Sequence, residues 1–192
     1  MESHWVLACS SLLLVGAAPP PQSPTASALP GPAPVIAYPA NSFEGRILAQ
    51  HNAERARYGL APLRWDPALV PGAAQWAATM AQTGIFDHSP KANRPGVAEN
   101  MAMGARGYFG LDRLVGTWLA ERAAFTPGFF PNTSRTGNWL HTSHYTQVIW
   151  PATNRIGCAM ASGRGNDYLV CRYSPKGNQD GKPVGISRVE RG

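Results

Sequence analysis

In residues 43–58, side chains that can pack against a core recur every three or four positions, which is the spacing of one side of an α-helix. These side chains fall on one or two adjoining faces and belong to Ile47, Leu48, His51, Arg55 and Tyr58. Ser42 precedes them as a capping residue, and Gly59 follows them where a helix commonly ends. The pattern predicts a first helix over residues 43–58.

Two further stretches have the same periodicity. Asp66-Pro67 is a capping residue followed by a proline at the first helical position, and the apolar positions after it lead to Gly84. Those positions are Leu69, Ala73, Trp76, Ala77 and Met80. The third stretch covers residues 111–122, with one side made of Leu111, Leu114, Val115, Trp118 and Arg122. We expect a second and a third helix here.

Residues 155–160 and 167–173 are short runs rich in strand-forming side chains, each bounded by glycine or a polar turn. The predicted helices come first and the strands last. That order favours an α+β layout over alternating parallel βαβ units. We find no internal repeat.

The chain has 192 residues, 44% of them hydrophobic and 15% charged, which suits one domain with one core. Residues 5–18 form an apolar run of signal-peptide length, too short for a comfortable membrane span. We expect a signal peptide over residues 1–28, cleaved after Ala28, and hence a secreted, extracellular or periplasmic protein. An N-terminal membrane anchor, a misplaced start codon and a lipid-modified Cys9 are the alternatives.

Residues 19–39 contain eight prolines and no charge. Such a segment cannot offset its ordering entropy by burial, so it is typical of an extended linker. We assign a Pro/Ala-rich linker to residues 29–41, a folded domain to residues 42–183 and a tail to residues 184–192.

Once the signal segment is removed, Cys158 and Cys171 are the remaining cysteines, one in each predicted strand. An even pair in an exported domain is most simply a disulfide. Such a bridge contributes roughly 3 kcal/mol in the chain-entropy treatment. The alternative is two buried free thiols, and zinc ligation by this pair lacks the neighbouring His or Cys that it would need.

Two blocks carry a family resemblance. Residues 143–150 read Ser-His-Tyr-Thr-Gln-Val-Ile-Trp, and residues 168–178 read Tyr-Leu-Val-Cys-Arg-Tyr-Ser-Pro-Lys-Gly-Asn. They resemble the two signatures of the CAP superfamily, which includes cysteine-rich secretory proteins, antigen 5 allergens and class-one pathogenesis-related proteins. The resemblance implies a three-layer α-β-α sandwich with a small, mainly antiparallel central sheet.

The resemblance also implies a cleft. In the family two histidines and two glutamates line it, and the matching positions here are His88, Glu99, Glu121 and His144. The imidazoles often hold a divalent metal, commonly zinc, so His88 and His144 are the expected metal ligands. Two neutral imidazoles leave coordination positions for water, and nearby carboxylates fix their tautomers. Such an open site is weaker than a three-ligand zinc site.

Each of these residues has a plainer interpretation. His88 could cap a turn before Ser89-Pro90, and Glu121 could lie on a solvated helix face. His51 matches a family position, and we interpret it as a structural residue. His141 matches nothing; it is either an accessory ligand or an exposed loop histidine.

The resemblance implies a binding module for lipids or sterols, with cell-wall, defence or interaction roles as an alternative. Between Glu121 and His144 lies a turn-rich stretch with five large apolar residues that would line a groove or join the core: Phe125, Phe129, Phe130, Trp139 and Leu140. A zinc-dependent hydrolase or peptidase stays open, with Glu99 or Glu121 as base for a metal-activated water. The sequence shows no nucleophile elbow and no His-Glu-x-x-His motif.

The net charge is +6, and residues 135–192 hold eight Lys or Arg against three acids. A basic C-terminal third in an exported protein suggests an anionic cell-surface polymer or lipid headgroup as partner, although ordinary solubility explains it too. No nucleic-acid recognition motif is present, so we expect no nucleic-acid partner. We expect a monomer.

Overall fold

The computed structural model describes residues 1–2 and 37–186. The predicted signal segment after residue 2, the linker up to residue 36 and residues 187–192 lie outside the described part. The described helices are α1 (Phe43–Ala56), α2 (Val70–Thr83), α3 (Leu111–Ala120) and the short α4 (Ser143–Val148). Four single 3₁₀ turns accompany them: η1 (Pro67–Leu69), η2 (Lys91–Asn93), η3 (Glu121–Ala123) and η4 (Trp139–Thr142).

The helix ends follow the capping residues in the sequence. The Ser42 side chain accepts a hydrogen bond from the backbone N–H of Gly45 at 3.0 Å, so α1 begins as expected. It ends at Ala56, two residues before the predicted end. Asp66 caps η1, which leads directly into α2. Gly84 ends α2 with a φ of 79°, a left-handed conformation that glycine adopts without strain.

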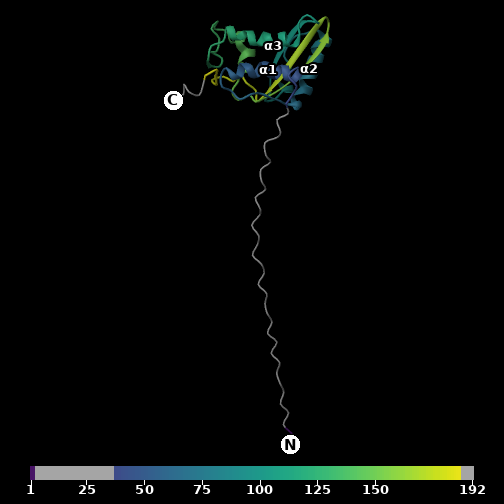
Figure 1. Cartoon of the computed structure of the whole chain (residues 1–192), viewed down its shortest axis with the longest axis vertical. Coiled ribbons are helices and arrows are strands. Elements are labelled where there is room, and N and C mark those ends of the chain that lie inside the picture. Colours follow the sequence, from purple (N-terminus) through teal and green to yellow (C-terminus); the bar gives the residue numbers. More distant parts are fainter. Residues whose placement is uncertain (3–36, 187–192) are drawn as a thin grey trace. The chain divides into compact units, whose positions relative to one another are not determined.

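The main sheet has the order β1-β4-β5-β2. The hairpin of β4 (Arg155–Gly163) and β5 (Asn166–Ser174) forms its centre, drawn yellow-green in Figure 1. Strand β2 (Ala98–Ala105) pairs antiparallel with β5, and the short β1 (Arg64–Trp65) pairs parallel with β4. A separate two-stranded sheet joins β3 (Gly128–Phe129) to β6 (Pro183–Val184). The sheet is thus small and mainly antiparallel, as expected.

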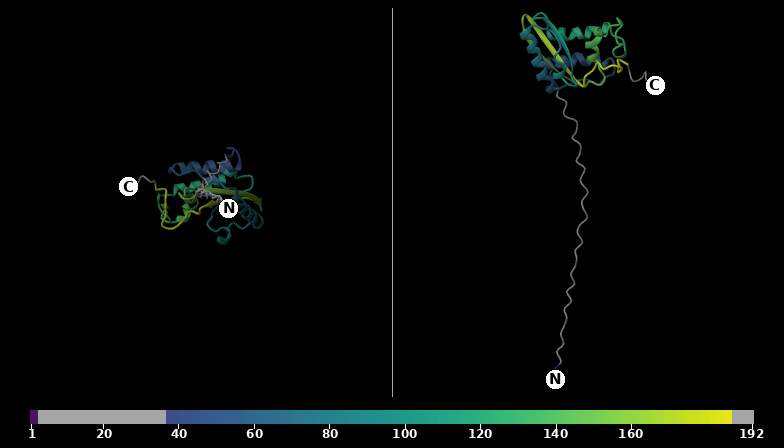
Figure 2. Two further views of the ribbon diagram at one scale, coloured as in Figure 1. Left: turned by 90° about the horizontal axis from the view of Figure 1, so that it is seen from below. Right: turned by 180° about the vertical axis from the view of Figure 1, so that it is seen from behind.

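Helices cover both faces of this sheet. On one face α2 buries Ala73, Ala77 and Met80 against a cluster that includes Met101 of β2 and Val170 of β5. On the other face α1 and α3 pack on the neighbouring side chains of the same strands, with a buried set that includes Ile47, Leu114, Trp118, Ala102 and Leu169. Seen from below, the yellow-green strands run between helices (Figure 2). The expected α+β, three-layer α-β-α sandwich is therefore confirmed.

Strand β2 and helix α4 do not follow from the periodicity of the sequence. The strand reads Ala-Glu-Asn-Met-Ala-Met-Gly-Ala, which lacks the β-branched and aromatic residues that favour strands. Its small side chains serve packing instead. A Cβ on Gly104 would lie 2.7 Å from ring atoms of Phe109, so only glycine lets the following loop close over the strand.

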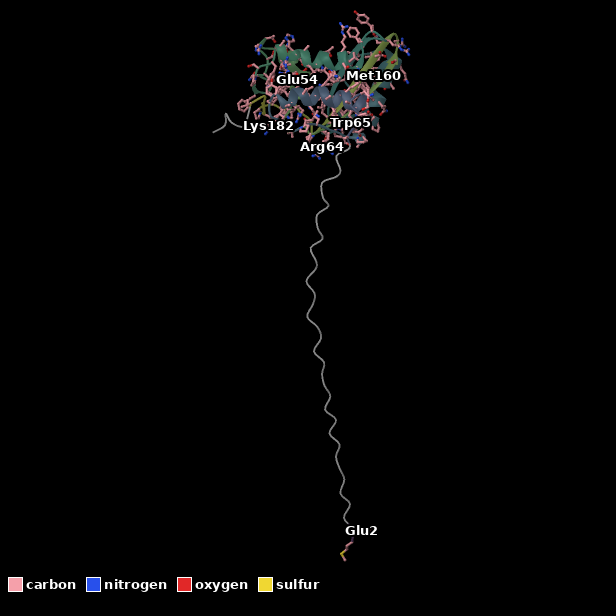
Figure 3. The ribbon with its side chains drawn as sticks, in the orientation of Figure 1. Glu2, Glu54, Arg64, Trp65, Met160 and Lys182 are labelled. Atoms are coloured by element: carbon pink, nitrogen blue, oxygen red, sulfur yellow. A yellow bond between two sulfur atoms is a disulfide. The ribbon has the colours of Figure 1, made fainter. Side chains whose placement is uncertain are left out.

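Polar groups of α1 hold α4 in place. The buried guanidinium of Arg55 donates to the carbonyl oxygens of Val148, Trp150 and Thr153 at 2.9–3.0 Å. The neighbouring Glu54, labelled in Figure 3, accepts a hydrogen bond from the Tyr145 hydroxyl at 2.9 Å. Glu54 and Arg55 are adjacent in α1, but these partners lie more than 90 residues away in the sequence. These bonds fix the backbone from which His144 projects.

None of the helices in residues 1–2 and 37–186 is long and apolar enough to cross a bilayer.

Candidate functional site

The first predicted pair of site residues meets at the start of β2. His88 lies in the segment that follows α2, and its Nδ1 lies 3.0 Å from Oε1 of Glu99. The same carboxylate accepts hydrogen bonds from the Ser89 backbone N–H at 3.0 Å and from the Ser89 hydroxyl at 2.8 Å. The Glu99 side chain has no solvent exposure. It is therefore a buried anchor for the imidazole.

Two arginines add positive charge around this carboxylate. Arg94 Nε lies 3.8 Å from Oε1, and Arg172 Nε lies 3.5 Å from Oε2. Burial is the largest single effect on the Glu99 pKa and acts to raise it. Hydrogen bonds from His88 and Ser89 and the charge of Arg94 act the other way and leave the pKa below its usual value. Glu99 is thus ionised at neutral pH.

The second pair joins α4 to the end of α3. His144 Nδ1 lies 2.6 Å from Oε1 of Glu121, which belongs to η3. The other oxygen, Oε2, accepts hydrogen bonds from the backbone N–H groups of His144 at 2.9 Å and Tyr145 at 3.0 Å. The ring of Trp118 stacks near the imidazole, with the centroids 6.5 Å apart and the planes at 20°. The His144 ring is thereby held from two sides.

The two pairs impose the same tautomer. An imidazole whose Nδ1 faces a carboxylate carries its proton there, which leaves the lone pair on Nε2. In the described part of the chain, no hydrogen bond uses Nε2 of His88 or of His144. Each ring therefore offers one nitrogen ligand, backed by a carboxylate in the way that metal-binding histidines commonly are.

Both imidazoles line one cleft with a volume of about 690 Å³. Glu99 also lines this cleft, whereas Glu121 lies behind His144 and is not part of its wall. Trp139 and Leu140 form an apolar part of the wall and are 41% and 56% exposed. Three basic side chains lie there too: Lys91, Arg94 and Lys176. The cleft thus combines nitrogen ligands, apolar surface and positive charge.

The structure therefore brings the four predicted residues into two carboxylate–imidazole pairs. Within residues 1–2 and 37–186, no group of three or more His, Cys, Asp or Glu side chains is arranged to hold a metal ion. A metal in this cleft would have two protein ligands, His88 and His144. The carboxylates support the imidazoles and do not complete the ligand set.

The other histidines are placed differently. His51 is buried, with Nδ1 2.8 Å from the Ile47 carbonyl oxygen and Nε2 2.9 Å from the Tyr173 hydroxyl, so it bonds within the fold. His141 is exposed, and its Nδ1 lies 2.9 Å from the Thr136 hydroxyl; it belongs to η4 and does not line the cleft. His51 is thus structural, and His141 is an exposed histidine, although a 3₁₀ turn holds it where a loop was expected.

Sequence reasoning missed several polar residues beside the site, and Asn100 is one of them. Asn100 is buried, and its amide nitrogen donates to the His144 carbonyl oxygen at 3.1 Å and to the Tyr173 hydroxyl at 3.2 Å. It follows Glu99 directly, so it lies on the opposite face of β2 and links α4 to the sheet. The adjacent polar residues Glu99 and Asn100, at the start of an otherwise apolar strand, are the sequence feature that could have identified Asn100 as a site residue.

The turn-rich stretch between the two pairs divides between core and surface. Phe125 and Phe130 are buried in a cluster with Tyr145, Val148 and Trp150. Phe129, Trp139 and Leu140 are exposed, and the last two line the cleft. The core and groove interpretations are each right for part of the segment.

The predicted disulfide is confirmed. Cys158 and Cys171 are bonded, with a sequence separation of 13 and a Cα–Cα distance of 4.1 Å. They are directly opposite partners on β4 and β5. The bridge therefore reinforces the central hairpin, and neither cysteine lines the cleft.

Comparison with known proteins gives consistent matches. The profile of the cysteine-rich secretory protein family, CAP, matches residues 48–173. A pathogenesis-related protein of PR-1 type from Sambucus nigra is 34% identical over 133 residues, 69% of this chain and 75% of the relative. Golgi-associated plant pathogenesis-related protein 1 from Homo sapiens is 32% identical over 140 residues, 71% and 84% of the two chains. Among solved structures, NaASP2 crystallised with Zn²⁺ has a TM-score of 0.63 at 22% identity, covering 81% of this chain and 89% of the other.

Proposed function

Since this chain belongs to the cysteine-rich secretory protein (CAP) family, we propose that it is an exported binding module whose ligand site is the histidine cleft. Lipids or sterols are the leading ligand class. The observation that carries the proposal is the composition of the cleft: about 690 Å³ with an apolar wall next to imidazole and ammonium groups. Cavities for small ligands commonly measure about 300–1,000 Å³.

The apolar wall supports an amphiphilic ligand. Trp139 and Leu140 both line the cleft, and 41% and 56% of their surfaces are exposed and available to a ligand. Covering each square ångström of apolar surface contributes about 25 cal/mol. Because this apolar surface lines the same cleft as His88 and His144, a ligand with an apolar part and a polar end matches the cleft better than a sugar or an ion alone.

A divalent metal such as zinc fits the donor set in part. His88 and His144 would hold it through Nε2, since Glu99 and Glu121 fix each Nδ1 proton. The metal, when bound, would supply a Lewis-acid contact for a polar ligand group. Two protein ligands make a weaker site than three. Occupancy would therefore follow the free metal concentration outside the cell.

The hydrolase alternative has less support from the geometry. A general base needs a carboxylate oxygen that can reach water or substrate. Both oxygens of Glu99 and both of Glu121 already accept hydrogen bonds from the chain. Each carboxylate would have to leave these partners before it could accept a proton from substrate. Positioning of the imidazoles explains the same contacts without that cost.

The lipid proposal is tested by ligand binding to the full exported chain. We expect fluorescent fatty-acid and sterol probes to bind, and the double variant Trp139→Ser/Leu140→Ser to bind them at least tenfold more weakly. Phe129→Ser is the matched control, because Phe129 is 57% exposed and does not line the cleft. Equal affinities in all three proteins, or no binding to the wild type, would refute lipid binding in the cleft.

A further inference from the structure

His88 lines a second cavity besides the cleft. This cavity measures about 200 Å³ and lies between α2 and the segment that follows it. Its walls are largely apolar, with Trp76, Met80, Ile85 and Pro90 among them. Ile85 is 66% exposed, so much of its apolar surface is open to a ligand. The cavity therefore offers apolar surface directly beside one of the two cleft imidazoles.

The size of the second cavity limits what it can hold. A cavity of about 150 Å³ is enough for a benzene-sized molecule. A volume of about 200 Å³ therefore accommodates an apolar group of roughly six carbons and not a whole lipid. The neighbouring cleft, at about 690 Å³, has room for the remainder of such a ligand.

The charges of the two cavities differ. Lys91 and Lys176 line the cleft, and neither has an ion-pair partner within residues 37–186. Of the acids there, Glu99 is already engaged by His88 and two arginines, which leaves Asp180. The second cavity has no Lys or Arg in its wall and contains Asp87. An anionic group is therefore favoured in the cleft and disfavoured in the second cavity.

These observations orient one ligand across both cavities. We propose that the pair of cavities binds a single amphiphilic anion, with its carboxylate or phosphate head at Lys91 and Lys176 and its alkyl chain past His88 into the apolar cavity. Pro90 lines one cavity and Lys91 the other, so adjacent residues contact the two parts of the ligand. The proposal rests on the lipid-binding function above and names the ligand class and the chain subsite.

The alkyl chain is tested with a series of carboxylates from butyrate to octanoate, measured by calorimetric titration of the full exported chain. We expect affinity to rise about fourfold per methylene until the cavity is filled. Ile85→Asn should flatten this rise and bind octanoate at least tenfold more weakly. Met160→Asn is the matched control, because Met160 (labelled in Figure 3) is an apolar side chain that is 43% exposed and lines neither cavity.

The head group is tested with octanoate, octyl phosphate and the neutral octyl glucoside. The double variant Lys91→Ala/Lys176→Ala should bind both anions at least tenfold more weakly and the glucoside as the wild type does. Lys182→Ala is the control, since Lys182 is exposed and lines neither cavity. The stronger of the two anions identifies the head as carboxylate or phosphate.

The outcomes separate this inference from the broader function. If Ile85→Asn and Met160→Asn bind octanoate equally, the chain subsite is wrong, even when Trp139→Ser/Leu140→Ser still loses long-chain and sterol probes. If the lysine variant binds both anions as the wild type does, the head assignment is wrong. The lipid-binding function itself is refuted when the wild type binds neither the anions nor the long-chain probes.

Discussion

The two imidazoles of the cleft are alike in how they are supported, although their carboxylates come from different elements. His88 is paired with Glu99, 11 residues later, and His144 with Glu121, 23 residues earlier. In both pairs the carboxylate also accepts a hydrogen bond from a backbone N–H: that of Ser89, next to His88, and that of His144 itself. Each glutamate thus fixes both the ring and the backbone of its partner, which makes the orientation of Nε2 a property of the fold.

Glu99 should contribute to stability at neutral pH. Removing one member of a buried ion pair leaves the other charge uncompensated, here Arg172, and typically costs about 3–5 kcal/mol. We expect Glu99→Gln to lower the free energy of unfolding at pH 7 by about 3 kcal/mol. The measurement is urea unfolding followed by tryptophan fluorescence. Glu44→Gln alters a carboxylate in the first turn of α1 that has no ion-pair partner in the described residues, so it should change the free energy of unfolding by no more than about 1 kcal/mol.

The same residue has a pH signature. The folded-state pKa of Glu99 lies below the ordinary 4.5, so its stabilisation is present above that value and is lost as the pH falls through the folded-state pKa. Glu99→Gln should lose less stability than the wild type on going from pH 5 to pH 3. Parallel losses in the two proteins would show that other carboxylates govern acid unfolding.

His51 should govern a different pH range. Its burial lowers the pKa from 6.5 to about 4, partly offset by the hydrogen bond to Ile47 and reinforced by the charge of Arg55. Below pH 6.5 the unfolded chain takes up a proton that the folded protein refuses until about pH 4. Stability should therefore fall by about 1.4 kcal/mol per pH unit within this window, or about 3 kcal/mol in all.

This slope is measured by urea unfolding at half-unit steps between pH 7 and pH 4.5. His51→Gln should reduce it, whatever the variant's stability at pH 7. His141→Gln is the control, because His141 is exposed in η4 and its replacement should leave the slope unchanged. A His51→Gln protein whose stability falls as steeply as the wild type's would contradict the assignment.

At the level of elements, the sequence predicted what local rules determine. The three long helices carry their own periodicity and caps, such as Ser42 and Gly84, and the β4–β5 hairpin has strand-forming residues. Strand β2 forms because β5 offers it eight backbone partners and because its small residues fit under the helices. That reason is tertiary, so neither propensity nor alternation could reveal it.

The disulfide should stabilise the central hairpin in a measurable way. Cys158 and Cys171 close a loop with a sequence separation of 13, for which the chain-entropy treatment gives about 3 kcal/mol. We expect Cys158→Ala/Cys171→Ala to remain folded, since the two strands keep their backbone ladder, and to unfold at lower urea concentration. The measurement compares this variant with the wild type, with and without reductant.

Reductant supplies the internal control for this prediction. It should weaken the wild type toward the stability of the double alanine variant and leave the variant itself unchanged. If reduced wild type keeps its full stability, the bridge contributes nothing beyond the hairpin. Loss of fold in the variant under native conditions would instead show that the hairpin depends on the bridge.

On the scale of the whole molecule, the candidate site depends on distant segments. The cleft wall draws on the segment after α2, the start of β2, η4, α4 and the segment after β5. The family resemblance predicted the types and positions of the four central residues, because each matching motif is local, although only His144 lies in one of the two signatures. They could not predict that Lys91 and Lys176, 85 residues apart, line one cleft, or that Glu121 stays behind His144.

Export is the remaining property of the whole chain, and we propose that residues 1–28 direct it. A disulfide in the folded domain is consistent with an oxidising compartment. We expect protein collected from the medium or periplasm of an expression host to begin at Leu29 and to contain the Cys158–Cys171 bridge. Intact-mass measurement before and after reduction and alkylation reads both features in one sample.

Ala28→Trp places a large side chain at the predicted cleavage site and should block processing, because signal peptidase requires small residues there. Ser23→Ala, upstream of that site, is the matched control and should be processed normally. Exported protein that still begins at Met1, or an Ala28→Trp protein cut at the same bond, would contradict the assigned boundary; retention of the wild type in the membrane fraction would favour an anchor instead.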